Sequence, residues 1–97
     1  MAIVDVVVIP VGTEGPSVSK YIADIQKKLQ EYKAMGKIDF QLTPMNTLIE
    51  GELSDVLEVV QVIHELPFDK GLSRVCTNIR IDDRREKKKK MNDKLTS

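Results

Sequence analysis

The segment that most constrains this chain is residues 3–9, Ile-Val-Asp-Val-Val-Val-Ile, which has the composition of a β-strand with two apolar faces. Successive side chains of a strand point to opposite sides of a sheet. The segment therefore divides into two rows: Val4, Val6 and Val8 on one face, and Ile3, Asp5, Val7 and Ile9 on the other. Since Asp5 alone interrupts the apolar character of the second row, we expect both sides of this strand to be covered.

Two other segments have the periodicity of amphipathic helices. Residues 17–35 repeat apolar side chains at helical spacing, with Ser17 in the position of an N-cap and Gly36 as the stop signal. Residues 53–66 show a similar pattern, although the β-branched run at 59–63 keeps a strand open as the alternative. We expect this second helix to stop before Pro67, because the residue before a proline disfavours helical geometry.

Three more segments, residues 38–43, 46–50 and 74–82, have the character of strands. The resulting order βαββαβ predicts an α+β, ferredoxin-like sandwich, with a four-stranded antiparallel sheet whose central strands are the first and third. Both helices would cover one face. The opposite face would carry one of the two rows of residues 3–9, beside Cys76, Asn78 and Arg80. We therefore expect a second copy of the chain to cover this face.

Length and charge divide the chain into one domain at residues 1–83 and a charged, helical C-terminal tail at residues 84–97. Residues 84–94 hold seven lysines and arginines against two acidic residues, whereas the whole chain has a net charge of zero. A solvated terminal helix is the simplest interpretation of such a run. Binding of nucleic acid by the tail and contact with an acidic neighbouring subunit are the alternatives.

The remaining composition narrows the cellular context. A single cysteine fits a reducing compartment, no apolar stretch approaches the roughly 20 residues that span a bilayer, and no basic region precedes the first apolar run. We therefore expect a cytoplasmic protein without a membrane partner. The two central strands lack the aromatic residues on which RNA bases stack in related sheets, so nucleic-acid binding by the sheet is not expected.

Side chains suited to catalysis are scarce. His64 and Cys76 are the single histidine and cysteine, and both fit structural roles better than those of a base and a nucleophile. The turn at residues 12–19 lacks the lysine of a phosphate-binding loop, and Glu14 would repel phosphate. Ion pairing with the following arginines explains Asp82-Asp83 more simply than metal binding. We therefore expect no catalytic residues, no metal and no cofactor.

Several short stretches resemble the thiamine-binding protein family of the YkoF-like superfamily. They are Gly12-Thr13 with Ser17-Val18-Ser19, Thr43-Pro44-Met45-Asn46-Thr47 running into Ile49-Glu50-Gly51, and Ser73-Arg74-Val75 before Ile79-Arg80-Ile81-Asp82-Asp83-Arg84. The resemblance covers nearly the whole chain in the expected order. It implies a ferredoxin-like domain that assembles into dimers or tetramers and binds thiamine or its hydroxymethylpyrimidine half. Asn46 stands where this family would lead us to expect a smaller residue.

The chemistry of that ligand suggests which residues contact it. The expected ligand-binding residues are Thr13, Ser17, Ser19, Met45, Thr47 and Glu50. Hydroxyl groups would bond to the aminopyrimidine, Met45 would form an apolar wall, and the Glu50 carboxylate would accept from the amino group or favour the cationic thiazolium. Alternatively, Glu50 pairs with Arg74 or Arg80.

Three classes of function remain after these arguments. The first is non-catalytic binding of a small heteroaromatic metabolite by a homo-oligomer. The second is a regulatory or interaction protein whose self-assembly is its function, with no small-molecule ligand. A hydrolase is the weakest of the three, because the chain offers so few groups that act as bases.

Overall fold

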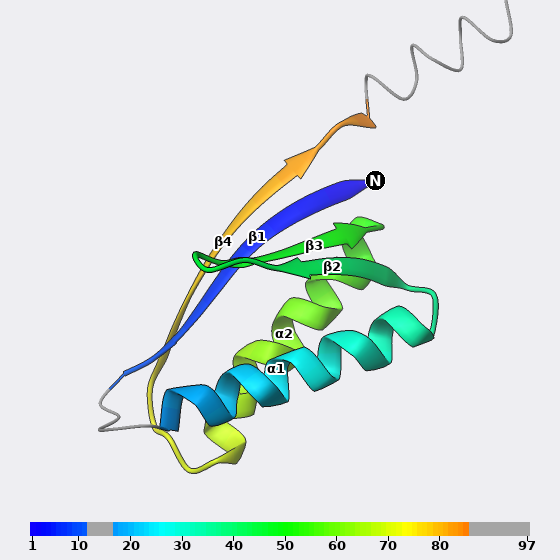
Figure 1. Ribbon diagram of the computed structural model, residues 1–97. Helices are drawn as coiled ribbons and strands as arrows, with labels where there is room; N and C mark the ends of the chain where they lie inside the picture. The colour runs from blue at the N-terminus through cyan, green and yellow to red at the C-terminus, as the bar shows by residue number, and fades with distance from the viewer. Residues whose placement is uncertain (12–16, 86–97) are drawn as a thin grey trace, which may run out of the picture.

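The computed structural model describes residues 1–11 and 17–85, and of residues 17–20 it describes the backbone. Its elements follow the predicted order βαββαβ (Figure 1). They are β1 (Ala2–Pro10), α1 (Ser17–Ala34), β2 (Ile38–Leu42), β3 (Thr47–Gly51), α2 (Leu53–Asp69) and β4 (Val75–Asp83). The α+β prediction is therefore confirmed. The predicted helical tail covers residues 84–97, and its residues 86–97 lie outside the described part of the chain.

The four strands form one antiparallel sheet in the order β2-β3-β1-β4, so the first and third strands are central, as predicted. β1 pairs with β4 along its whole length, from Ala2 opposite Asp83 to Pro10 opposite Val75. Its pairing with β3 is shorter and ends at Val6 opposite Thr47. The β2–β3 turn therefore lies just beyond the end of the β1–β3 ladder.

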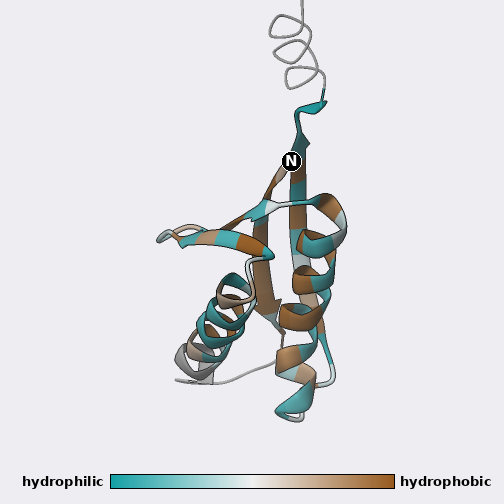
Figure 2. Cartoon of the chain, turned by 90° about the vertical axis from the view of Figure 1, so that its right-hand side faces the viewer, coloured by the Kyte–Doolittle hydropathy of each residue, from teal (hydrophilic) through white to brown (hydrophobic). Residues whose placement is uncertain are grey.

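One row of β1 forms the centre of the hydrophobic core. Val4 and Val6 are buried and pack with residues of both helices, which lie together on one side of the sheet (Figure 1). The buried cluster consists of Val4, Val6, Ile25, Leu29, Ile38, Ile49, Val56, Val59, Val60 and Ile63. Figure 2 shows that α2 carries more hydrophobic residues than α1, whose outer surface is mainly hydrophilic. Burial of this cluster removes apolar surface from water, which favours folding.

The other row of β1 lies on the side of the sheet that the helices leave uncovered, which we call the open face. The register places Asp5 beside Arg80, Val7 beside Asn78 and Ile9 beside Cys76 on this face. The sequence predicted the row of Cys76, Asn78 and Arg80 here, and the register shows that the row with Asp5 is its neighbour. The side chains of Ile3 and Ile9 remain 48% and 42% exposed. Within the single chain, the apolar row of β1 therefore stays in contact with water.

Helix α1 ends as the sequence predicts. Gly36 has a φ of 77°, in the left-handed region that glycine adopts without a Cβ penalty. Its N–H donates to the Lys33 carbonyl at 2.9 Å, and the Lys37 N–H donates to the Tyr32 carbonyl at 3.2 Å. This pair of bonds is the Schellman motif, which satisfies two carbonyls at the end of a helix.

The predicted end of α2 is wrong. The helix continues through Pro67 to Asp69, and the Pro67 side chain is buried. Proline lacks one N–H, but its carbonyl still accepts from Leu72 at 3.2 Å, while Gly71 (φ 95°) donates to Phe68 at 3.0 Å. The Schellman motif at Gly71 and the burial of the ring offset the single lost hydrogen bond. Across the described residues, none of the helices is both long and apolar enough to span a membrane.

Candidate functional site

The β2–β3 turn, α1 and β1 surround a small hollow on the helix side of the sheet, which we call the turn slot. Its volume is about 200 Å³. The slot is lined by Val6, Val7, Val8, Ile22, Ile25, Leu42, Thr43, Pro44, Met45, Asn46, Thr47 and Ile63. Apolar side chains with a few hydroxyl and amide groups, and no charged side chain among these lining residues, are typical of a site for a flat organic ligand.

Two of the expected ligand-binding residues meet in the turn slot. Met45 lies at the tip of the turn and is 83% exposed, while Thr47 is half-buried at the start of β3. Within the described residues, no hydrogen-bond partner is recorded for the Thr47 hydroxyl, whereas that of Thr43 donates to Oδ1 of Asn46 at 2.6 Å. The exposed thioether of Met45 is therefore accessible to a ligand.

The first turn of α1 approaches the same slot. Ser17 and Ser19 lie in this turn, and Ile22, which lines the slot, follows Ser19 by three residues, or about 4.5 Å along the helix axis. Their side chains are outside the described part of the structure, and so is Thr13. The structure thus places the backbone of two expected ligand residues near the slot and leaves Thr13 unplaced.

Glu50 lies elsewhere. It lines a second hollow, of about 280 Å³, on the open face, which we call the open-face hollow. The lining residues of this hollow are Ile3, Asp39, Phe40, Gln41, Leu48, Ile49 and Glu50. Thr47 and Glu50 are three residues apart on one strand, so the alternation of a strand directs them to opposite faces. The two-residue period of strand 46–50 was the sequence signal for this separation.

The arginines suggested as partners of Glu50 do not pair with it. Arg80 instead forms an ion pair with Asp5, with 3.0 Å between Nη2 of the guanidinium and Oδ2 of the carboxylate. The register explains this choice, because Asp5 and Arg80 are direct neighbours across β1 and β4. Within the described residues, Glu50 has no ion pair closer than 4.0 Å.

A second carboxylate of the open-face hollow is electrostatically perturbed. Asp39 lies 3.1 Å from the Lys33 ammonium and accepts from the N–H of Phe40 at 2.8 Å. The hydrogen bond from Lys33, followed by the N–H of Phe40, lowers the pKa of Asp39 below its ordinary value. Asp39 therefore stays anionic to a lower pH than an aspartate without these partners.

The side chains with the greatest catalytic potential lie away from both hollows. His64, on α2, has its Nδ1 2.6 Å from the Thr77 hydroxyl of β4, and Cys76 is exposed at the end of the open face. Among residues 1–11 and 17–85, no three histidine, cysteine, aspartate or glutamate side chains are grouped as a metal site. The contact of His64 with Thr77 has no signal in the sequence, because only the packing of α2 on β4 creates it.

Comparison with known proteins identifies the family. Residues 4–97 match the model of the family described as thiamine-binding protein. The chain belongs to the thiamine-binding protein family. The resemblance noted in the sequence is therefore confirmed over nearly the full length.

Members of the thiamine-binding protein family are close to this chain in sequence. A UPF0045 protein of Staphylococcus xylosus, encoded in the glkA 3' region, is 82% identical over 95 residues, which are 98% of this chain and 89% of that protein. The UPF0045 protein YqgV of Bacillus subtilis is 67% identical over 97 residues, or 100% and 93% of the two chains.

Solved structures share the fold of this family member. The hypothetical protein MJ1052 of Methanocaldococcus jannaschii superposes with a TM-score of 0.75 at 27% identity, over 98% of this chain and 92% of that one. A Thermotoga maritima protein, whose structure carries the provisional name of a thiamine biosynthesis/salvage protein, superposes with a TM-score of 0.69 at 19% identity. The superposition covers 86% of this chain and 83% of that one. At this sequence identity, the similarity to the Thermotoga maritima protein shows a shared fold and nothing more.

Proposed function

We propose that this protein binds thiamine or its hydroxymethylpyrimidine half, without catalysing a reaction, as a cytoplasmic homo-oligomer packed through its sheets. The observation that carries the proposal is the convergence on the turn slot of two stretches that resemble the family. Residues 43–47 line the slot, and the first turn of α1 begins five residues before Ile22, which also lines it. Family membership supplies the class of ligand.

The turn slot suits an aminopyrimidine better than a charged group. Its apolar walls bury a flat ring, and burial of an ion without a partner is costly. The Thr47 hydroxyl can accept from the amino group or donate to a ring nitrogen. Met45 supplies a polarisable side chain against the ring face. In this arrangement the cationic thiazolium of thiamine stays at the mouth of the slot, in water.

The open-face hollow is the second placement for the same ligand. There Glu50 and the anionic Asp39 would favour the thiazolium cation, and Ile3 and Leu48 would form the apolar wall. The hollow is a depression on an exposed sheet, so a second copy of the chain would have to cover it. Because the two hollows lie on opposite faces, single substitutions distinguish them.

Calorimetric titration with thiamine and with hydroxymethylpyrimidine tests the proposal. We expect saturable heat with at least one of them, and Thr47→Val, which keeps the shape but removes the hydroxyl, to weaken binding about tenfold. Glu50→Gln is the matched variant for the open face. Loss of binding in Glu50→Gln but not in Thr47→Val would move the ligand to the open-face hollow. If neither ligand gave heat of binding at millimolar concentration, the proposal would be overturned.

A regulatory or interaction role through self-assembly is the second candidate. The exposed apolar row on the open face supports it, because this row needs a cover whether or not a ligand binds. A protein of this class would assemble in solution and give no heat with either compound. The same titration, combined with a measurement of mass, therefore separates the two functions.

A further inference from the structure

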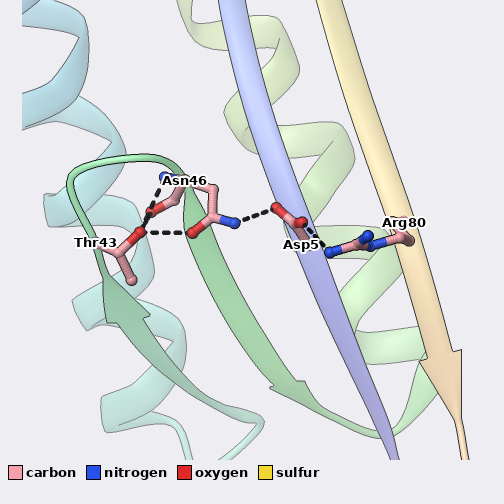
Figure 3. Close-up of polar contacts among 4 residues, drawn as sticks. All are labelled: Asp5, Thr43, Asn46 and Arg80. Atoms are coloured by element: carbon pink, nitrogen blue, oxygen red, sulfur yellow. Dashed lines mark hydrogen bonds and ion pairs between the residues drawn. The ribbon is translucent and has the colours of Figure 1, made fainter.

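A chain of polar side chains runs from the turn slot across β1 to β4 (Figure 3). The Thr43 hydroxyl donates to Oδ1 of Asn46 at 2.6 Å, and Nδ2 of Asn46 donates to Oδ1 of Asp5 at 2.6 Å. Arg80 donates to the other oxygen of Asp5 at 3.0 Å. The Asp5 side chain is 23% exposed, so both oxygens are partly sheltered and each has one partner.

Asn46 lines the turn slot and is also a member of this series of hydrogen-bonded side chains. It lines the slot, while its amide crosses to the Asp5 carboxylate, 41 residues away in sequence. Its backbone N–H donates to the Thr43 hydroxyl at 3.0 Å, and its carbonyl accepts from the Thr43 N–H at 2.9 Å. The turn is therefore closed internally by Thr43 and Asn46.

These internal bonds leave the position of the turn relative to β1 undetermined. The backbone ladder between β1 and β3 ends at Val6 and Thr47, before the turn. Among the side-chain hydrogen bonds recorded for the described residues, the bond from Asn46 to Asp5 is the one that connects the turn to another strand. A bond to an ionised acceptor is stronger than one between neutral groups.

We propose that Asp5 is a positioning residue for the turn slot. Through Asn46 it holds the turn that carries Met45 against β1, so that Met45 forms one wall of the slot together with Thr47 of β3. Arg80 supports the carboxylate from the opposite side. The proposal rests on the proposed function insofar as the slot binds the ligand, but the anchoring of the turn is measurable without any ligand.

The test compares Asp5→Ala with Asp5→Asn. The alanine removes the acceptor, whereas asparagine retains an oxygen that can accept from Asn46. We expect Asp5→Ala to weaken thiamine binding about tenfold and to speed amide hydrogen exchange at Met45 and Asn46 by a similar factor, and Asp5→Asn to restore most of both. Asn78→Ala, an exposed change on the same face, is the matched control and should leave both unchanged.

Sedimentation of each variant shows whether its assembly equals that of the wild type, so that a change of mass is not mistaken for a change in the turn. Unchanged hydrogen exchange at Met45 and Asn46 in Asp5→Ala would overturn the proposal, whatever the ligand does. Normal thiamine binding by Asp5→Ala, together with loss of binding by Thr47→Val, would also overturn it and leave the proposed function standing. Absence of binding by the wild type would instead count against the proposed function, and hydrogen exchange would still decide the role of Asp5.

Discussion

The Nδ1 atom of His64 lies 2.6 Å from the hydroxyl oxygen of Thr77, and this contact joins the middle of α2 to β4. The imidazole also meets the ring of Phe68 edge-on, with 5.6 Å between the ring centres. Both partners of the hydrogen bond are half-buried. The single histidine of the chain therefore links a helix to an edge strand, as a structural residue.

Removal of the Thr77 hydroxyl should destabilise the fold. Thr77→Val keeps the shape and the β-branched side chain, but leaves His64 without its partner, so we expect the free energy of unfolding to fall by about 1 kcal/mol. Thr77→Ser retains the hydroxyl and is the control. Urea denaturation at neutral pH measures the difference. Equal midpoints for the valine and serine variants would show that the contact contributes nothing.

The ion pair between Lys33 and Asp39 should appear in the titration of the aspartate. Lys33→Met removes the larger cause of the lowered pKa, so we expect the pKa of Asp39 to rise toward its ordinary value. Because the folded-state pKa is the lower one, the pair stabilises the protein above the unfolded-state pKa, and this stability is lost as the pH falls through the folded-state pKa. Titration by NMR of the carboxyl carbon measures the shift.

A matched variant is available on the neighbouring loop. Lys37→Met removes a lysine that pairs with Glu58, at 3.7 Å, and should leave the Asp39 titration unchanged. Both groups of the Lys33–Asp39 pair are exposed, so added salt should shrink the effect of Lys33→Met. If neither Lys33→Met nor added salt changed the pKa of Asp39, Lys33 would not be the cause of the lowered value.

Gly36 should tolerate asparagine better than alanine. Apart from its two chain neighbours, no residue would lie within 4 Å of a Cβ at position 36, so the cost of a side chain comes from the backbone φ of 77°. We expect Gly36→Ala to lower the free energy of unfolding by about 1 kcal/mol, and Gly36→Asn by less, because asparagine enters the left-handed region more readily. Thermal denaturation of both variants measures the order, and the reverse order would contradict this account.

A charge on the open face should prevent the self-association that we propose. Val7→Lys places an ammonium group in the middle of the apolar row of β1, and burial of an unpaired charge against a second copy is costly. We expect the wild type to sediment as an oligomer and Val7→Lys as a single subunit. Leu57→Lys, at a position on α2 that is 40% exposed, is the matched control. If the wild-type protein sedimented as a stable single subunit at low concentration, the proposed assembly through the sheets would be wrong.

Local sequence signals predicted most of the element boundaries. The helix that begins at Ser17 and the stop at Gly36 follow from side-chain period and from backbone sterics, which act within a few residues. The same kind of rule failed at Pro67, because the prediction considered the lost N–H and could not include the burial of the ring or the hydrogen bonds around Gly71. The residues expected to form one ligand site do not all lie together. The reason is local, since the two-residue period of a strand places Thr47 and Glu50 on opposite faces of the sheet.

The amino-acid sequence alone determined the order of the elements, the two rows of β1 and the family, because periodicity and short motifs are properties of neighbouring residues. The tertiary structure decided which distant side chains meet. Asp5 joins Asn46 and Arg80, and His64 joins Thr77, across separations of 41, 75 and 13 residues. These contacts depend on strand register and helix packing, which the whole core sets at once, and no single segment of the chain encodes them.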